Sequence, residues 1–330
     1  MAANIFLPPG FDGQRKYPAV VVVHPGGGVK EQTAGVYAQR LAERGFVTLA
    51  FDASHQGASG GLPRLLDDPM KRVGDIYSAV DYLTTLSYVD NSRIGALGIC
   101  AGSGHTIKGT TTDRRIKAVA TVSAVDVGAA FRKGWDGKGS VAEQLVALEA
   151  AAKQRTAEAA GAAPVFVPYV PNVGDKTAPL DLQEAADYYL TPRGQHPNAP
   201  NKMLLTSTNH MMAYTGFDQV ETLLTQPVMI ITELLVQGAS TIWPELTIDD
   251  YAERTEQTMT AWSGMNGQQG GDPAKLATAL VSLSDSGALP LRFVAGADAI
   301  AAVEAKLKTI QEQIDAHRDL SASLALDKSK

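Results

Sequence analysis

The sequence has a single cysteine among its 330 residues, so an internal disulfide is excluded. A chain without disulfides suits a reducing compartment. No apolar run approaches the roughly 20 residues that a membrane-spanning helix needs. The first nine residues have neither the basic start nor the apolar core of a signal peptide. These absences predict a cytoplasmic protein that does not associate with membranes.

Basic residues are not gathered into a stripe with aromatic residues between them. The formal net charge of −6 comes from acidic and basic residues that are mixed along the chain. Nucleic acid is therefore not expected as a partner. The phosphate-binding pattern G-x-x-x-x-G-K-[ST] is also absent. We expect a small-molecule substrate, and neither a cofactor nor a metal ion.

Apolar runs with strand character alternate with helical patterns over the first 231 residues. Continuous apolar runs are typical of strands that are covered on both faces of a parallel sheet. Their alternation with helices predicts the α/β class, with a doubly wound and mostly parallel sheet. The expected strands are 3–7, 17–24, 46–52, the run ending at residue 99, 116–123 and 226–231. The expected helices are 31–44, 70–87 and the segment that follows residue 100.

Residues 125–225 interrupt this alternation. They contain an Ala/Glu/Gln-rich helix at 140–160, a proline-punctuated loop at 164–179, and helical patterns at 181–189 and 217–225. An insertion between two strands of the sheet predicts a helical cap over the mouth of the site. We expect residues 1–231 to form one body that carries this cap insertion.

The remaining residues, 232–330, are expected to complete the same domain. Their patterns predict helices at 247–263 and 272–284, a strand at 291–296 and a long final helix at 298–323. This final helix and the outer edge of strand 3–7 would each permit a homodimer.

The most informative stretch is Gly98-Ile99-Cys100-Ala101-Gly102. A strand that ends in Gly-x-Cys-x-Gly before a helix has the pattern of a nucleophile elbow, with cysteine in the place of serine. Side chains two residues before and after the nucleophile would collide in so sharp a turn, so both positions need glycine. A thiol at a helix N-terminus is also expected to favour its reactive thiolate. The alternative is that Cys100 is a small buried apolar residue.

A thiol that attacks an ester or thioester carbonyl needs N–H donors for the oxyanion, a base, and a group that orients the base. The backbone N–H of Ala101 lies directly after the nucleophile. The glycine-rich loop after strand 17–24 offers Gly26 and Gly27 as further donors. The alternative for this loop is a plain turn between a strand and a helix.

Residues 1 to about 231 resemble the dienelactone hydrolase family of α/β-hydrolases. The resemblance rests on segments 20–28, 51–54, 98–102, 115–123 and 191–197. It implies that Cys100 is the nucleophile, that an acid follows strand 227–231, and that a histidine follows the last strand.

From about Thr232 the chain resembles the C-terminal third of a short-chain dehydrogenase/reductase. Segments 232–235, 249–254, 271–277 and 291–299 carry this resemblance. The chain has neither T-G-x-x-x-G-x-G nor Y-x-x-x-K, the patterns of cofactor binding and catalysis in that family. The chain therefore has the pattern of a fusion or an engineered chimera.

None of the six histidines lies where the hydrolase resemblance places one. His24 is expected to be structural, His105 to turn away from Cys100, and His317 to lie on a solvated helix face. His55 and His210 could approach the site. We take His210 as the candidate base and Glu233 as the candidate acid.

The predicted function is hydrolysis of small esters, lactones or thioesters through Cys100, weakly unless a histidine is recruited. The alternatives are an inactive α/β scaffold and, less favoured, an NAD(P)-dependent reductase.

Overall fold

The computed structural model describes residues 1–135, 137–231, 282 and 297–322. The chain divides into two compact units, residues 1–269 and 270–330. In the second unit the predicted final helix is confirmed as α11 (Ala297–Ala322). The predicted helix 247–263 and strand 291–296 lie outside the described residues, as does helix 272–284 apart from residue 282. The prediction that residues 232–330 complete the hydrolase domain therefore stays a prediction.

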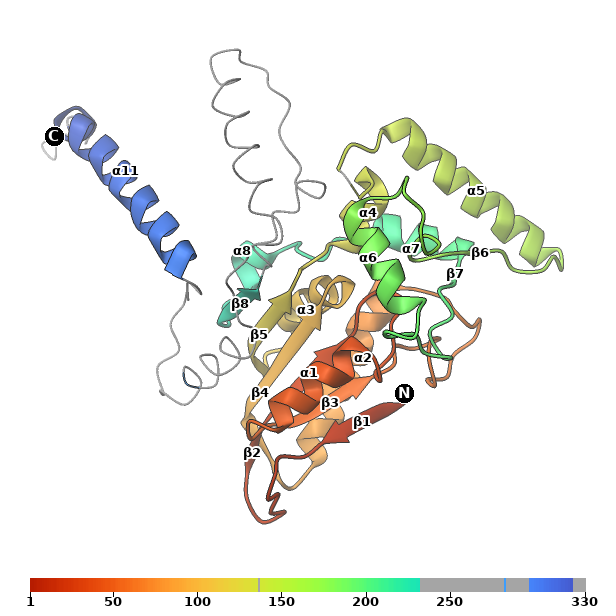
Figure 1. Cartoon of the computed structure of the whole chain (residues 1–330), viewed down its shortest axis with the longest axis horizontal. Coiled ribbons are helices and arrows are strands. Elements are labelled where there is room, and N and C mark those ends of the chain that lie inside the picture. The colour runs from red at the N-terminus through yellow and green to blue at the C-terminus, as the bar shows by residue number, and fades with distance from the viewer. Residues whose placement is uncertain (136, 232–281, 283–296, 323–330) are drawn as a thin grey trace, which may run out of the picture. The chain divides into compact units, whose positions relative to one another are not determined.

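A six-stranded sheet forms the body of the first unit, with the strand order β1-β3-β2-β4-β5-β8 (Figure 1). Its strands are β1 (Ala3–Phe6), β2 (Tyr17–Val23), β3 (Val47–Phe51), β4 (Val89–Ile99), β5 (Ile116–Val122) and β8 (Val228–Ile231). All neighbours in this order are parallel except β1, which runs antiparallel to β3 at the edge of the described sheet. The doubly wound, mostly parallel sheet is thus confirmed.

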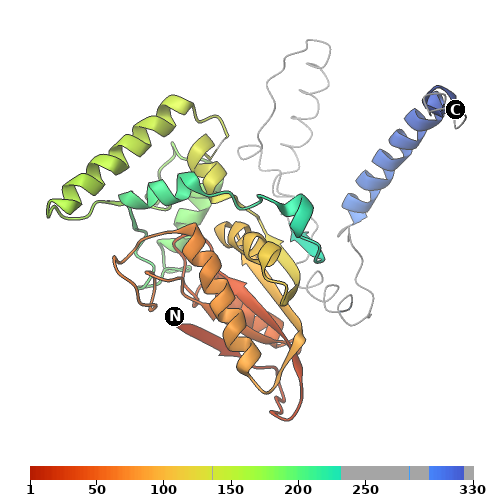
Figure 2. The same ribbon diagram turned by 180° about the vertical axis from the view of Figure 1, so that it is seen from behind.

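Helices cover both faces of the sheet. Helix α1 (Thr33–Ala42) covers one face, where Ala34 and Ala38 pack against Val22. Helices α2 (Pro69–Thr85) and α3 (Ala101–Thr112) lie on the other face (Figure 2). Val22 belongs to β2, and α2 packs against the residues of β2 that alternate with it, including Val21. This two-residue alternation explains why β2 is apolar along its whole length.

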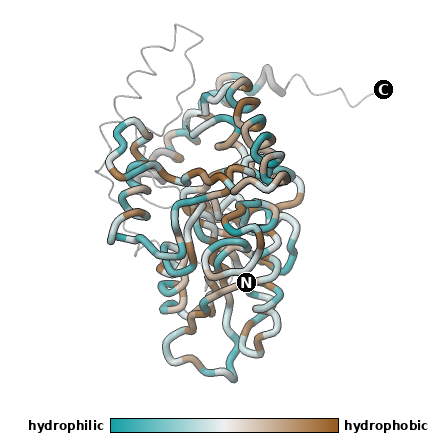
Figure 3. The backbone as a smooth tube through the Cα atoms, turned by 90° about the vertical axis from the view of Figure 1, so that its right-hand side faces the viewer, coloured by the Kyte–Doolittle hydropathy of each residue, from teal (hydrophilic) through white to brown (hydrophobic). Residues whose placement is uncertain are grey.

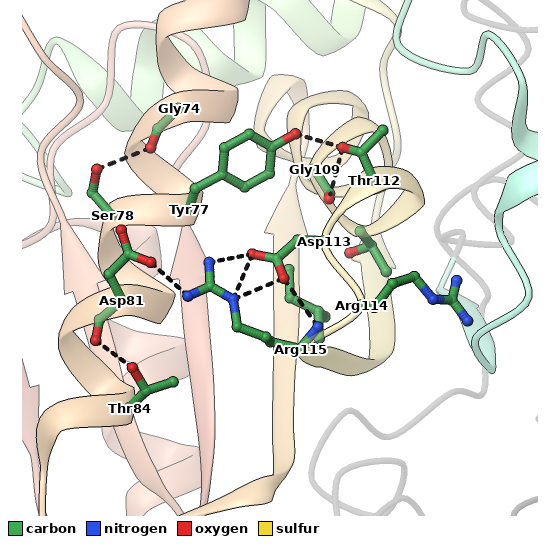
Figure 4. A network of polar contacts seen from close by, with 12 residues as sticks. Gly74, Tyr77, Ser78, Asp81, Thr84, Gly109, Thr112, Asp113, Arg114 and Arg115 are labelled. Carbon is green, nitrogen blue, oxygen red and sulfur yellow. Dashed lines mark hydrogen bonds and ion pairs between the residues drawn. The ribbon is translucent and has the colours of Figure 1, made fainter.

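Polar side chains join α2 to the connection between α3 and β5 (Figure 4). Asp113, which ends α3, accepts hydrogen bonds from the guanidinium of Arg115 at the start of β5. The same guanidinium donates to Asp81 of α2 at 2.5 Å. Because Arg115 is 41% exposed, this ion pair orients the helix more than it stabilises it.

The expected helical cap is present over the carboxyl ends of the strands (Figure 1). Its elements are α4 (Val127–Lys133), α5 (Val141–Ala159), β6 (Phe166–Val167), α6 (Leu180–Tyr189), β7 (Met203–Leu204), the 3-10 turn η1 (Leu205–Ser207), α7 (Thr208–Ala213) and α8 (Val220–Leu223). The backbone tube of Figure 3 alternates between hydrophilic and hydrophobic colours along the helices, as expected where one face of a helix is buried. Within the described part, no helix is both long and apolar enough to cross a membrane.

Candidate active site

Cys100 stands at the sharp turn between β4 and α3, as the elbow pattern predicts. Its backbone has φ 52° and ψ −121°, a conformation that is strained for a residue with a side chain. Hydrogen bonds hold the turn in place. The Cys100 N–H donates to the Val122 carbonyl at 2.9 Å, and the Cys100 carbonyl accepts from Val125 at 3.2 Å.

The two glycines that flank Cys100 are required by close backbone contacts. A Cβ atom at Gly98 would lie 2.5 Å from the Gly102 carbonyl oxygen, and one at Gly102 would lie 2.5 Å from the Val23 carbonyl oxygen. Both distances are too short for real Cβ atoms, and backbone cannot yield as a flexible side chain can. The prediction that both positions need glycine is confirmed.

Two backbone segments meet beside the thiol. A Cβ atom at Gly26 would lie 3.5 Å from Ala101 Cβ, and the N–H groups of both residues lower the pKa of Cys100. They come from the start of α3 and from the loop after β2, the two segments that the sequence selected as oxyanion donors. Gly27 lies one residue further, has φ +68° and is covered by the ring of Tyr169.

The acidity of Cys100 differs from the expectation. Burial raises the pKa of the thiol and the carboxylate of Asp181 adds to this, while the hydrogen bonds from Ala101 and Gly26 and the charge of Arg72 oppose it. The net result is a raised pKa. The N–H groups thus favour the thiolate as expected, but burial outweighs them and the sulfur keeps its proton more firmly than a free thiol.

Two of the histidines are buried beneath the site and are poor bases. Burial, followed by the charge of Arg72, lowers the pKa of His24 to about 4 and that of His105 to about 3. His24 accepts a hydrogen bond from the Ala53 N–H at 3.2 Å, in agreement with its expected structural role. His105 packs against Tyr214, and among the described residues neither of its ring nitrogens has a hydrogen-bond partner.

The remaining candidate partners of Cys100 are His55, His210 and Glu233. His55 is buried in the loop after β3, with its Nδ1 3.0 Å from the Pro63 carbonyl oxygen. His210 lies on α7, with its Nδ1 3.4 Å from an Asp68 oxygen, so its ion-pair partner is at the start of α2. Glu233 lies outside the described residues. The roles of His210 as base and Glu233 as acid remain predictions.

A narrow pocket of about 10 Å³ opens beside the glycine-rich loop, residues 25–28, which is room for about one water molecule. It is lined by Gly26, Gly27, Tyr169, Val170, Tyr189, Ala199 and Asn201. The cap supplies five of these residues, so cap side chains fill most of the space beside Gly26 and Gly27.

Sequence reasoning missed the residues that the cap and the loop after β3 bring here, chiefly Tyr169, Asp67 and Arg72. Tyr169 stands in the proline-punctuated loop, where no periodicity places a side chain. The pair Asp67–Arg72 could have been suspected, since Asp67 directly precedes the Asp68-Pro69 start of α2 and Arg72 lies in its first turn.

Comparison with known proteins agrees with this geometry. Residues 1–125 match the dienelactone hydrolase family model. The uncharacterized protein YcjY of Escherichia coli is 49% identical over 231 residues, which cover 70% of this chain and 76% of that protein. The uncharacterized protein PA2218 of Pseudomonas aeruginosa is 36% identical, covering 70% of this chain and 62% of that protein. Its crystal structure matches with a TM-score of 0.66, covering 72% of the crystallised chain.

The Thiohydrolase aneE of Aspergillus aculeatus is 26% identical over 246 residues, 73% of this chain and 75% of that protein. The family match ends at residue 125, so it gives no support to the reductase resemblance of residues 232–330, which stays a prediction. On these matches and on the fold, the chain belongs to the dienelactone hydrolase family, whose members are hydrolases acting on ester bonds.

Proposed function

We propose that the protein hydrolyses small esters, lactones or thioesters by covalent catalysis through Cys100. One observation carries this proposal: Cys100 stands at the tip of a strained elbow, where the glycine-rich loop and the start of α3 lie side by side, with a Cβ atom at Gly26 only 3.5 Å from Ala101 Cβ. A cysteine with only a packing role needs no strained backbone. The N–H groups of these two segments are candidates to donate to the oxygen of a carbonyl that Cys100 attacks, which acyl transfer requires.

The reaction begins when Cys100 Sγ forms a bond to the carbonyl carbon and the carbonyl electron pair moves to the oxygen. The N–H groups of Gly26 and Ala101 stabilise that oxyanion. The thiol proton passes through a base to the leaving alcohol or thiol as the bond from carbon to the leaving group breaks. A water molecule then attacks the acyl-cysteine, releasing the acid and returning a proton to the sulfur.

The raised pKa of Cys100 makes the base important, because the resting sulfur carries its proton. His210 and Glu233 are the pair we propose for this role. In the described part of the chain, His210 Nδ1 lies 3.4 Å from Asp68 Oδ2, which leaves Nε2 as the nitrogen that would take the proton of Cys100. A relative named as a thiohydrolase supports thioesters among the substrates.

The test is turnover of p-nitrophenyl acetate and of the acetyl thioester of N-acetylcysteamine. Cys100→Ala should lower kcat/KM by roughly a thousandfold or more, since it removes the atom that forms the covalent bond. The control is Val146→Ala, which changes an exposed cap residue that is 67% accessible and should leave the rate unchanged. Intact-mass spectrometry should detect an acetyl group on the wild type and none on Cys100→Ala.

Equal rates for the wild type and Cys100→Ala, with no acetyl adduct, would contradict the proposal. That result would favour the alternative of an inactive α/β scaffold. His210→Gln separates the two parts of the mechanism. It should slow turnover if His210 is the base, and leave it unchanged if another group takes the proton.

A further inference from the structure

Tyr169 connects the cap to the body through its hydroxyl. The hydroxyl donates to Asp67 Oδ2 at 2.7 Å and accepts from Gln56 Nε2 at 3.0 Å. Burial and the neighbouring Asp67 carboxylate raise the pKa of Tyr169 well above its ordinary value, so the phenol keeps its proton and remains a donor. The contact is a charge-assisted hydrogen bond in a buried place, which is the stronger kind.

The acceptor of that bond is itself fixed. Asp67 is 2% exposed and takes two hydrogen bonds from Arg72, at 2.6 Å from Nε and 2.9 Å from Nη2. Arg72 Nη2 also donates to Gln56 Oε1 at 3.0 Å. Burial alone would raise the pKa of Asp67, but Arg72 outweighs burial and lowers it. The side chains of four residues thus form a closed circuit of hydrogen bonds: Tyr169, Asp67, Arg72 and Gln56.

The backbone of Tyr169 is fixed as well. Asn201 Oδ1 accepts from the N–H groups of Tyr169 and Val170, at 2.9 and 3.0 Å, and Asn201 Nδ2 donates to the Val170 carbonyl at 2.9 Å. Because both ends of the side chain are held, the ring cannot swing aside without breaking hydrogen bonds at one of them.

The ring lies over the glycine-rich loop. A Cβ atom at Gly27 would lie 2.4 Å from Tyr169 Cδ2, and one at Gly26 would lie 3.6 Å from Cδ1. Gly26 lies beside Ala101, the residue that follows Cys100, with 3.5 Å between its Cβ position and Ala101 Cβ. Tyr169 therefore stands against the place where the carbonyl oxygen of a bound acyl group would lie, and it also lines the narrow pocket of about 10 Å³.

We propose that Tyr169 determines substrate size, so that short acyl groups reach Cys100 and bulky ones are excluded by a ring that the Asp67–Arg72 pair and Asn201 hold in place. This inference rests on the proposed function for its meaning as substrate selection. It makes Tyr169 a specificity-determining residue that contributes no proton or electron pair to the reaction.

The test uses the fact that Cys100 is the only cysteine of the chain, so that thiol alkylation reports on this site alone. The full-length protein is alkylated with iodoacetamide and, separately, with N-(1-pyrenyl)maleimide, and the ratio of the two rates is measured. Tyr169→Ala removes the ring and leaves Asp67 paired with Arg72. It should raise the ratio of the bulky to the small reagent by about tenfold or more, the discrimination typical of pocket size.

Two further variants sharpen the result. Tyr169→Phe keeps the ring but loses the hydroxyl bonds, so its ratio should lie between those of the wild type and Tyr169→Ala. Phe217→Ala, which removes a cap side chain that is 41% exposed, is the matched control and should leave the ratio unchanged. If Tyr169→Ala lacks a cooperative melting transition, Tyr169→Leu decides by the same ratio.

Turnover gives the second readout. The preference of Tyr169→Ala should shift from acetyl towards octanoyl thioester by about tenfold in the ratio of kcat/KM values. A folded Tyr169→Ala protein whose alkylation ratio stays within about twofold of the wild type would overturn the inference. Failure of the proposed function is separate: it would show as absent turnover in every variant, while the alkylation ratio would still decide whether Tyr169 limits access.

Discussion

The sheet body and the cap are stabilised by different means. In the body, large side chains such as Phe51, Ile76, Leu83 and Ile94 are at most 1% exposed. In the cap, the 19-residue helix α5 buries Ala151 alone, while Val141 and Leu145 are 69% and 55% exposed. The body is thus held by large apolar side chains, whereas the cap adds a smaller apolar cluster, with Met203, Met211 and Tyr214 packed beside Val73, and α5 lies largely outside it.

Polar contacts lie where the cap meets the body. Asp67 receives the Tyr169 hydroxyl, and its own N–H donates to Ser207 Oγ at 2.9 Å. On the other side of the site, Gln32 Nε2 donates to the Gly194 carbonyl at 2.7 Å. The body therefore fixes the backbone around Cys100, and these hydrogen bonds join the cap to it on Asp67 and Gln32.

The sharpest test of this contrast is Arg72→Met. It leaves the buried Asp67 carboxylate without its cation and should lower the free energy of unfolding by about 3–5 kcal/mol. Urea denaturation measures the loss. Arg193→Met breaks an exposed pair with Asp187 within the cap and serves as the control, for which we expect a loss below about 1 kcal/mol. Similar losses for the two variants would mean that burial does not decide how much an ion pair of this protein contributes to stability.

Apolar packing is compared by the same truncation in the two regions. Leu83→Ala in α2 should lower the free energy of unfolding by about 2–5 kcal/mol, since it leaves a cavity in a fully buried core. Leu145→Ala in α5 should change it by less than about 0.5 kcal/mol, since the side chain is already exposed. Thermal and urea unfolding of both variants check the pair. A large loss for Leu145→Ala would mean that α5 takes part in apolar packing despite the exposure of this side chain.

Acid should weaken the body through its two buried histidines. Both have folded pKa values below the usual 6.5, at about 4 for His24 and about 3 for His105. Below pH 6.5 the unfolded chain therefore takes up protons that the folded chain refuses. Stability is complete above pH 6.5 and falls towards pH 4, by up to about 1.4 kcal/mol per pH unit for each histidine.

Urea unfolding at pH 7, 6 and 5 measures this slope. His105→Phe preserves an aromatic ring beside Tyr214 and should about halve the slope, because one of the two titrating groups is gone. An unchanged slope in this variant would assign the acid sensitivity to other groups.

The smallest loss of stability is expected at the exposed ion pair between Lys108 of α3 and Asp218 of the cap. Lys108 Nζ lies 3.3 Å from Asp218 Oδ2, and the aspartate side chain is 58% exposed. Asp218→Asn should cost at most about 1 kcal/mol and should cost less in high salt, because the pair is open to solvent. Denaturation with and without added salt tests this, and a loss that salt does not reduce would point to a buried contact.

The strands and the elbow could be predicted from the sequence because both depend on local patterns. β2 and β3 are continuous apolar runs, and Gly98 and Gly102 mark a turn whose steric demands are the same in any fold. The short helix α7 could not be predicted, since no side chain caps its start. α4 does carry a signal, because Asp126 accepts from the Gly128 N–H at 2.9 Å as an N-cap.

The chemistry of the site was less predictable than its position. The acidity of Cys100 depends on burial, which follows from the packing of the cap and cannot be read from neighbours in the sequence. The place of Tyr169 over Gly27 depends on contacts with residues more than 100 positions away, such as Asp67. The base could not be fixed either, because His210 pairs with Asp68 and Glu233 lies outside the described residues.

The edge strand β1 is fastened at a second place besides its pairing with β3. Just before this strand, the Ala2 N–H donates to Ser59 Oγ at 2.8 Å, and the Ala2 carbonyl accepts from the Asp52 N–H at 2.9 Å. The Asp52 carboxylate accepts from the Lys30 N–H at 2.8 Å, just after the glycine-rich loop 25–28. One buried aspartate thus links the outermost strand to the segment that follows this loop, so a change at Asp52 would be felt at both places.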